Sequence, residues 1–362
     1  MRYNRTYRLV GTQILSVETI FVMRCSNRLA VGAIAAAYAL GIAACGQSPT
    51  DGSQSGAADA EVKSVAVTQI VEHPALDAAR DGIQDELADA GYVAGETLNW
   101  SWESAQGNPT TATQIASKFV GDGPDAIVAI ATPSAQAAVA ASDSIPVIFS
   151  AVTDPVGAEL VDSLESPGGL ATGVTDLSPI GDHLDLIVEI LPETESIGGI
   201  YNAGEDNSVS LMKLILAEAP ERDLEIVEAT ATRSSEVSSA AQSLVGKVDA
   251  IYVPTDNTVA SALESVISVG QDNQLPVFAG DTDSVGRGAI ASLGFDYYDV
   301  GRQTGALVVQ VLEGADPATI PVQRVEQLNL VINLDAAEAM GVDIPAEVID
   351  RADEMTGDTV SQ

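Results

Sequence analysis

An internal duplication limits the folds open to this chain more than any other feature of its sequence. The matching segments are Ser64–Val67 with Ser196–Ile200, Phe119–Ile127 with Leu244–Ile251, and Ile145–Phe149 with Leu275–Phe278. A period of roughly 130 residues is too long for a solenoid repeat. It predicts two copies of one α/β lobe, with their strand ends facing each other across a cleft.

One strand and the helix after it stand at the centre of the first copy. The six apolar residues 126–131 are typical of a strand buried on both faces. Thr132 or Ser134 is then expected to cap a helix, with Pro133 in its first turn. Because this helix would begin at the carboxyl edge of the sheet, free backbone N–H groups and hydroxyls there predict an anion site.

The chain is strongly acidic, with 52 Asp and Glu against 16 Lys and Arg and a formal net charge of −36 over 362 residues. This length suffices for two domains. Nucleic-acid binding is excluded, because neutralising phosphates requires a basic surface. Self-repulsion of this size is relieved by salt, so we expect a halophilic or salt-tolerant source. An ordinary acidic secreted protein is the alternative.

Residues 1–45 are expected to form an export signal. Met23 fits the true start, because Arg24 and Arg28 then form a basic region before the short apolar run 29–40. That run is too short for a membrane span. Residues 1–22 would then be untranslated or dispensable.

The signal ends in Ile42-Ala43-Ala44-Cys45, the cleavage pattern of a lipoprotein. We expect Cys45 to be lipidated and residues 46–62 to form a flexible tether; a plain secretory signal is the alternative. Cys25 would be removed with the signal, so the body has no disulfide and no cysteine nucleophile.

The body is expected to be an α/β fold with two doubly wound (Rossmann-like) parallel-sheet lobes. Lobe I would comprise 63–175 and about 299–320, and lobe II 176–298 and about 321–350. Helices are predicted over 74–90, 110–120, 180–191, 209–219, 300–312 and 334–340. Strands are predicted over 64–70, 98–104, 126–131, 145–150, 196–201, 224–230, 250–253, 277–280, 290–293 and 325–333, with a short edge strand at 168–173.

Six segments together carry a resemblance to a known family. They are Glu72–Asp77, Ala129–Gln136, Phe149–Val156, Val253–Thr258, Phe278–Ser284 and Gly294–Gly301. They resemble the amino-acid-type substrate-binding lipoproteins of ABC importers, in the subgroup that binds tryptophan or phenylalanine. The resemblance covers 63–345 and implies a type I periplasmic-binding fold with three crossovers, a separately encoded permease and ATPase, and closure on a ligand. The extreme acidity departs from the family but leaves these segments intact.

The candidate site residues lie where predicted strands end or helices begin. In lobe I they are Thr68, Gln69, His73, Thr132, Ser134, Ser150, Thr153 and Asp154. In lobe II they are Asn202, Asn207, Ser208, Asp256, Asn257, Asp281 and Thr282.

Each of these residue types suits one part of a zwitterionic amino acid. Thr132 and Ser134 suit the α-carboxylate, as do Asn207 and Ser208 at a helix start. Asp256 and Asp281 suit the ammonium group, because hydrogen bonds to charged groups contribute about 1.5–3 kcal/mol. Helix capping and ordinary turn acids are the alternative roles. Most aromatic side chains are expected in the cores and some on the ligand: Trp100, Trp102, Tyr201, Tyr252, Phe295, Tyr297 and Tyr298.

Enzyme functions are not favoured. The sequence has no Gly-x-Ser-x-Gly, Walker or Gly-x-Gly-x-x-Gly motif, and His73 and His183 are too few for a typical zinc site. Asp281 and Asp283 could pair in a hydrolase, but an acidic chain produces such pairs by chance. We therefore expect no catalytic residue, metal or cofactor.

The predicted function is an extracytoplasmic, lipid-anchored solute-binding protein of an ABC importer. A ligand sensor that signals to a membrane partner would have the same fold. A neighbouring permease and ATPase would favour import, and a kinase or cyclase would favour sensing.

Overall fold

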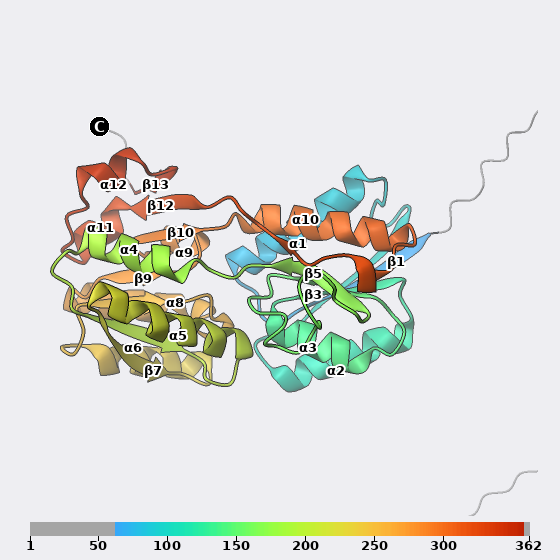
Figure 1. Ribbon diagram of the computed structural model, residues 1–362, viewed down its shortest axis with the longest axis horizontal. Coiled ribbons are helices and arrows are strands. Elements are labelled where there is room, and N and C mark those ends of the chain that lie inside the picture. The colour runs from blue at the N-terminus through green and yellow to red at the C-terminus, as the bar shows by residue number, and fades with distance from the viewer. Residues whose placement is uncertain (1–61, 358–362) are drawn as a thin grey trace, which may run out of the picture. The chain divides into compact units, whose positions relative to one another are not determined.

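Buried apolar side chains form two separate clusters in the computed structural model, which describes residues 62–357. One cluster lies within 62–175 and 295–328, which we define as lobe I. The other lies within 176–294 and 329–357, defined as lobe II (Figure 1). No helix among the described residues is both long and apolar enough to cross a membrane.

Lobe I is built on a six-stranded parallel sheet with strand order β11-β5-β4-β3-β1-β2. Its strands are β1 (Lys63–Gln69), β2 (Leu98–Ser104), β3 (Ala126–Ile130), β4 (Val147–Ser150), β5 (Ala171–Thr175) and β11 (Gln323–Arg324). Its helices are α1 (Pro74–Asp89), α2 (Pro109–Asp122), α3 (Thr132–Ala141) and α10 (Tyr297–Leu312), with the 3-10 turn η3 (Pro317–Thr319).

Lobe II has a four-stranded parallel sheet, β7-β6-β8-β9, and a three-stranded sheet, β10-β12-β13, in which β10 and β12 are antiparallel. Its strands are β6 (Ser196–Tyr201), β7 (Glu225–Thr230), β8 (Ala250–Val253), β9 (Val277–Ala279), β10 (Ala291–Gly294), β12 (Asn329–Asn333) and β13 (Glu354–Thr356). Its helices are α4 (Ile180–Ile190), α5 (Asp206–Glu218), α6 (Val237–Leu244), α7 (Asn257–Ala260), α8 (Leu263–Asn273), α9 (Asp283–Gly286), α11 (Leu334–Ala339) and α12 (Ala346–Asp350), with 3-10 turns η1 (Ala219–Arg222) and η2 (Ser234–Glu236).

The two lobes repeat one strand order, which confirms the duplication seen in the sequence. Going outward from β2 and from β7, the first four strands of each lobe follow the order 2-1-3-4 of a doubly wound fold. Even a local detail repeats: Asp125 accepts hydrogen bonds from the backbone N–H and hydroxyl of Ser64, and Asp249 accepts the same pair from Ser196. Ligands of such sheets bind beyond the carboxyl ends of the strands, where the order reverses.

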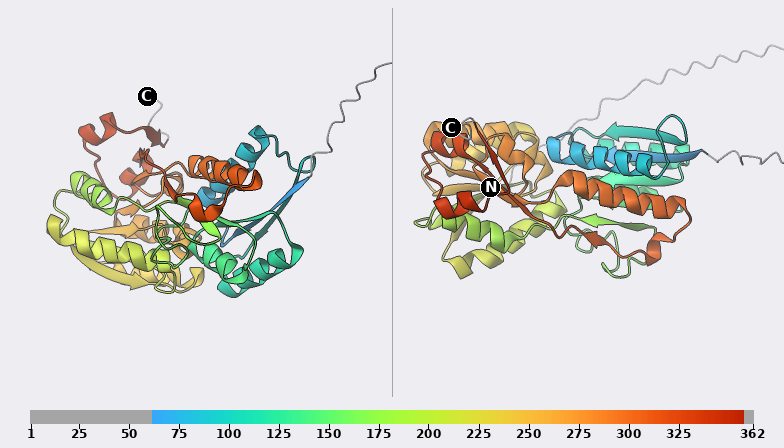
Figure 2. Two further views of the ribbon diagram at one scale, coloured as in Figure 1. Left: turned by 45° about the vertical axis from the view of Figure 1, so that its right-hand side comes forward. Right: turned by 90° about the horizontal axis from the view of Figure 1, so that it is seen from above.

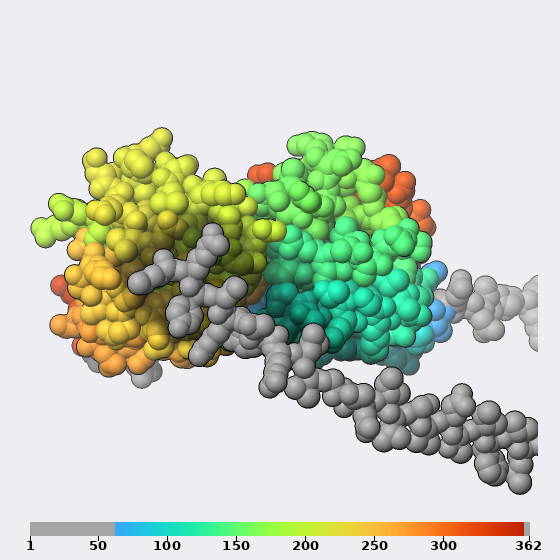
Figure 3. Space-filling view, turned by 90° about the horizontal axis from the view of Figure 1, so that it is seen from below, coloured from blue at the N-terminus to red at the C-terminus, as the bar shows by residue number. Residues whose placement is uncertain are grey.

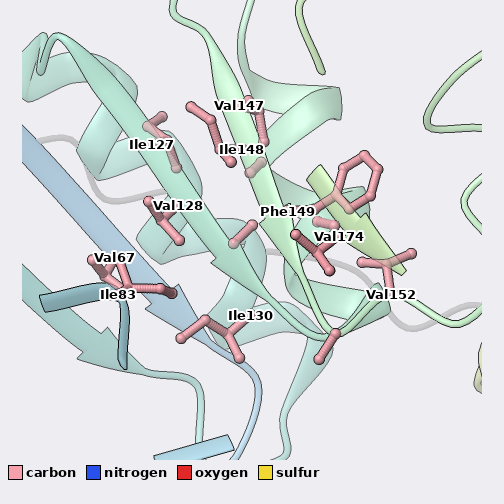
Figure 4. Close-up of a cluster of buried hydrophobic side chains, with 14 of the residues drawn as sticks. Val67, Ile83, Ile127, Val128, Ile130, Val147, Ile148, Phe149, Val152 and Val174 are labelled. Carbon is pink, nitrogen blue, oxygen red and sulfur yellow. The ribbon is translucent and has the colours of Figure 1, made fainter. Parts of the chain in front are cut away.

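The central strands of lobe I are apolar because helices cover both faces of the sheet. Every residue of β3 and β4 is buried. Figure 4 shows their side chains packed with those of neighbouring elements, including Val67 of β1 and Val174 of β5. This rigid core fixes where the strands end, and those ends carry the site.

Helices α1 and α10 pack closely side by side in lobe I (Figures 1 and 2). Glycines allow the contact, since a Cβ at Gly301 would lie 2.1 Å from the Ala79 carbonyl oxygen, and one at Gly82 would lie 2.2 Å from the Tyr298 carbonyl oxygen. The close approach fixes the two helix starts, at Pro74 and Tyr297, relative to each other.

The chain passes between the lobes three times, in agreement with the number that the resemblance implied. The passages lie between β5 and α4, between β10 and α10, and between β11 and β12. Figure 1 shows the last of these as the long red-orange segment that leads into β12.

Three local predictions were wrong. Residues 168–173 do not form an edge strand, because β5 begins at Ala171 and is covered by β11. The predicted strand over 325–333 is interrupted, since residues 325–328 form a passage between the lobes and β12 begins at Asn329. The apolar residues Leu211, Leu214 and Ile215 predict one buried face for the helix over 209–219, but Leu214 is 37% exposed.

Candidate ligand-binding site

A cavity lies between the lobes, at the carboxyl ends of their parallel strands. In this arrangement of the lobes its volume is about 20 Å³, little more than one water molecule needs, so a larger ligand requires the lobes to move apart. Lobe I and its helix α10 contribute His73, Ala75, Leu76, Ala131, Thr132, Ala151, Thr153 and Tyr297. Lobe II contributes Asp176, Asn207, Thr255, Asp256, Asn257, Ala260 and Asp281.

Direct hydrogen bonds join the lobes beside this cavity. The side-chain amide of Gln136 donates to Asp206 over 2.7 Å, and the Ser210 hydroxyl donates to Asp154 over 3.2 Å. Figure 3 shows the green surface of lobe I in contact with the yellow-green surface of lobe II. The structure is therefore a closed arrangement of the lobes.

The start of α3 forms the lobe I side of the cavity. The helix does not begin as predicted, because neither Thr132 nor Ser134 caps it; Ala131 occupies the cap position and has no side chain that could accept a hydrogen bond. The first N–H groups of the helix therefore keep no side-chain partner. The hydroxyl of Thr132 is buried and also lacks a partner. These groups suit an anionic ligand group.

Two alanines on this side have strained backbones. Ala131 has φ 73° and Ala151 has φ 54°, and both line the cavity. Residues with a Cβ rarely adopt positive φ, and such strain gathers at binding sites. A small side chain at these positions brings the backbone itself to the cavity wall.

The start of α5 contributes Asn207 from lobe II. Asn207 and Ser208 lie inside the first turn and do not cap the helix; the cap position belongs to Glu205. The Asn207 amide nitrogen donates to the Thr255 carbonyl and the Ser208 hydroxyl, which leaves its buried oxygen without a partner. This oxygen is available as an acceptor in the cavity.

Asp256 caps the short helix α7 through Val259 N–H and accepts a second bond from Asn202 N–H. Only 1% of it is exposed. Burial, reinforced by the nearby Glu205 carboxylate, raises the pKa of Asp256 to about 7. A ligand cation would favour its ionised form.

Asp281 follows β9 and accepts hydrogen bonds from the backbone N–H and hydroxyl of Ser284. It is also buried and faces the cavity. The only basic side chain among the lining residues is His73, and burial lowers its pKa to about 4, so its imidazole is neutral at pH 7. The cavity is thus acidic and has no lysine or arginine in its wall.

Seven of the fifteen residues predicted for the site line the cavity, namely His73, Thr132, Thr153, Asn207, Asp256, Asn257 and Asp281. The structure does not bring Thr68, Gln69, Ser134, Ser150, Asp154, Asn202, Ser208 and Thr282 to its wall.

Most of the residues outside the wall have other partners. Gln69 bonds Val71, Asp77 and Trp102 inside lobe I, and the Ser150 hydroxyl accepts from Thr304. Asn202 and Thr282 bond within their own loops and to neighbouring segments. The hydroxyls of Thr68 and Ser134 are buried without a partner and do not belong to the cavity wall.

Sequence reasoning missed Asp176 and treated Tyr297 only as an aromatic residue. Asp176 directly follows β5, so the rule that selected the other strand-end residues applies to it as well. The sequence pattern predicts this strand too early, at 168–173, and therefore does not mark Asp176 as a strand-end residue. Among the aromatic side chains considered, Tyr297 lines the cavity.

A two-lobed fold with a polar cavity at its strand ends defines a type I periplasmic-binding protein. The family described as "ABC transporter substrate binding protein" matches residues 64–356, so the chain belongs to this family. Substrate-binding proteins of ABC transporters act outside the cytoplasm, and the relatives named below are solute-binding proteins rather than enzymes.

Two relatives of this chain are described by the amino acid that they bind. The chain is 42% identical over 278 residues to a tyrosine-binding protein of Clostridioides difficile (strain R20291), covering 77% of this chain and 81% of the relative. It is similar to a Streptococcus pneumonia ABC domain solved in complex with L-Trp, with 36% identity, a TM-score of 0.79, and coverage of 81% and 99%.

A third relative helps to define the arrangement of the lobes. The ligand-free, open structure of CD0873, a substrate-binding protein with adhesive properties from Clostridium difficile, shares 38% identity over 81% of this chain and 99% of that one. Its TM-score is nevertheless only 0.62. The sequence identity and coverage are nearly equal to those of the L-Trp complex. The lower TM-score therefore reflects a difference in shape between the open structure and this one. The present structure is nearer in shape to the L-Trp complex than to that open structure.

Proposed function

We propose that this protein binds an aromatic amino acid between its lobes and delivers it to an ABC permease and ATPase. The observation that carries the proposal is that one cavity contains both acidic groups and groups suited to an anion. Buried carboxylates of Asp256 and Asp281 lie on the lobe II side, and the unpartnered hydroxyl of Thr132 lies at the start of α3 in lobe I.

Each half of a zwitterion has a counterpart in this cavity. An ammonium group would compensate the buried carboxylates, which are costly to keep charged without a cation. An α-carboxylate would accept from the first N–H groups of α3 and from Thr132. Both halves are satisfied together only when the lobes are closed, so the ligand favours the closed form.

The rest of the wall suits an apolar side chain. Ala75, Leu76 and Ala260 line the cavity, together with the ring of Tyr297. An aromatic ligand would bury its ring against these groups. The tyrosine-binding and L-Trp-bound relatives support the same class of ligand.

Calorimetry with matched ligands tests the proposal. We expect L-tryptophan, L-tyrosine or L-phenylalanine to bind, and to bind more tightly than the corresponding amine or the deaminated propanoate. A thermal-shift screen of the twenty amino acids would find the preferred one, because a ligand that binds only the folded state raises the melting temperature. Absence of binding by every amino acid would refute the proposal.

Substitution of Asp281 tests the ammonium partner. Asp281→Asn should weaken binding by about tenfold or more, since a hydrogen bond to a charged group is lost. Asp283→Asn is the matched control: it removes an acid two residues further along, at the start of α9 and outside the cavity wall. Equal affinity in Asp281→Asn and the wild type would remove Asp281 from the site.

We also propose that the protein is anchored by lipid on Cys45, with residues 46–62 as a tether. Cys45 and residues 46–61 lie outside the residues that the structure describes. The sequence pattern Ile42-Ala43-Ala44-Cys45 supports the proposal. Cys45→Ser should move the protein from the membrane fraction to the soluble fraction; continued membrane attachment of the variant would argue against lipidation.

A further inference from the structure

Asp176 lies in the first passage between the lobes, after β5 and before α4, and its side chain lines the cavity. The Thr153 hydroxyl donates to one carboxylate oxygen over 3.1 Å, and the Tyr297 hydroxyl donates to the other over 2.8 Å. Tyr297 begins α10, directly after the second passage. The carboxylate is therefore held where two of the three passages meet.

No basic side chain compensates this carboxylate within the cavity. Asp176 is 4% exposed, both of its hydroxyl donors are neutral, and the single basic residue of the wall, His73, is uncharged at pH 7. Burial raises the pKa of Asp176, and the charge of Asp281 raises it further. A buried carboxylate with two neutral donors and a second acid nearby is an incomplete site for a cation.

We propose that Asp176 is an ammonium-binding residue, and that Asp176 and Asp281 hold the ligand's ammonium group between them. This inference rests on the proposed function and adds to it a residue at the hinge. Asp281 belongs to the body of lobe II, whereas Asp176 belongs to a passage. The ammonium group then binds both the first passage between the lobes and the body of lobe II. Thr153 and Tyr297 are the positioning residues that orient the Asp176 carboxylate.

The arrangement determines which ligands are accepted. Asp176 lies in a passage between the lobes, so we expect it to be in place before closure. Asp281 completes the site as lobe II closes. A ligand with no cationic nitrogen leaves both acids uncompensated in the closed form, so the deaminated analogue should be rejected mainly through Asp176 and Asp281.

The test compares two ligands on the purified protein by calorimetry. They are the tightest-binding aromatic amino acid and its deaminated propanoate. In Asp176→Asn we expect the affinity for the amino acid to fall by at least about tenfold. We expect the affinity for the propanoate to stay the same or rise, so that discrimination between the two is largely lost. The ligand-free melting temperature should not fall, because a buried uncompensated charge has been removed.

Two further results decide against the inference. If Asp176→Asn unfolds, or weakens both ligands equally, Asp176 has a purely structural role. Tyr297→Phe keeps the carboxylate but removes one of its two positioning donors, so it should reduce the discrimination less than Asp176→Asn does. Full loss of discrimination in Tyr297→Phe with none in Asp176→Asn would assign ammonium recognition to the tyrosine hydroxyl. If the wild type binds neither ligand, the proposed function itself fails. This outcome is distinct from failure of the inference, because it is seen in the wild type alone.

Discussion

At the scale of single residues, the site is a set of buried carboxylates that have no cationic partner until a ligand binds. Asp176, Asp256 and Asp281 are all at least 94% buried, and lysine and arginine are absent from the cavity wall. Hydrogen bonds from backbone N–H groups and hydroxyls hold each carboxylate in place without neutralising it. The missing positive charge is the strongest indication of what the ligand carries.

The raised pKa of Asp256 predicts proton release on binding. Its pKa is about 7 in the folded protein and near 3.8 when unperturbed, so between about pH 4 and pH 7 the folded state holds more protons. Asp256 therefore lowers stability as the pH rises through this window. An ammonium ligand favours the ionised carboxylate, so binding below pH 7 should release protons and strengthen as the pH approaches 7.

Calorimetry at pH 6 in two buffers of different ionisation enthalpy measures this release. The apparent binding enthalpy should differ between the buffers, and Asp256→Asn should reduce the difference. Asp283→Asn is the control, because burial raises the pKa of Asp283 to about 6 although it lies outside the cavity wall. Identical enthalpies in both buffers would contradict the assigned protonation of Asp256.

A residue of the cavity wall could be predicted from the sequence only where the predicted end of the preceding strand was correct. Thr132, Asp256 and Asp281 follow strands that are continuous apolar runs, so the sequence placed them at the cavity. Asp176 follows a strand whose start was misjudged. Whether a side chain points into the cavity or into its own lobe, as Gln69 does, depends on partners far away in the chain.

At the scale of elements, the duplication made most of the fold predictable. Buried strands such as β6 and β8 were located to the residue, since helices on both faces require unbroken apolar runs. Helix starts were less predictable. The sequence favoured polar caps at Thr132 and Ser134, but backbone strain at Ala131 starts α3 without one. Such strain depends on tertiary packing and leaves no local pattern.

The contact between α1 and α10 predicts an unequal effect of two glycine substitutions. Gly301→Ala places a Cβ 2.1 Å from the Ala79 carbonyl oxygen, so the helices must separate at a cost of about 1–3 kcal/mol. Gly121→Ala is the matched control: it lies in helix α2 with nothing within 4 Å of the new Cβ, and it should stabilise by up to about 1 kcal/mol.

Chemical denaturation of both variants measures these free energies. Because α1 and α10 begin beside the cavity at Pro74 and Tyr297, Gly301→Ala should also weaken ligand binding, and Gly121→Ala should not. Equal stability of the two variants would show that the close contact between the helices is not required.

At the scale of the whole molecule, the net charge of −36 is the main departure from an ordinary binding protein. We expect the melting temperature to rise between low salt and about 1 M sodium chloride, where the screening length falls to about 3 Å. Sucrose of equal osmolality is the control for general solvent effects. A melting temperature independent of salt would speak against a salt-adapted protein.

Closure also belongs to this scale. The bonds from Gln136 to Asp206 and from Ser210 to Asp154 exist only when the lobes meet, although none of these four residues lines the cavity. They add to the closed form a stability that is independent of the ligand. The ligand supplies the remainder by satisfying polar groups from both lobes at once.

Small-angle X-ray scattering of residues 46–362, with and without a saturating amino acid identified by calorimetry, tests the central claim most directly. A ligand held by both lobes should lower the radius of gyration toward that of the closed structure described here. A bound ligand that leaves the scattering curve of an open protein unchanged would contradict the account.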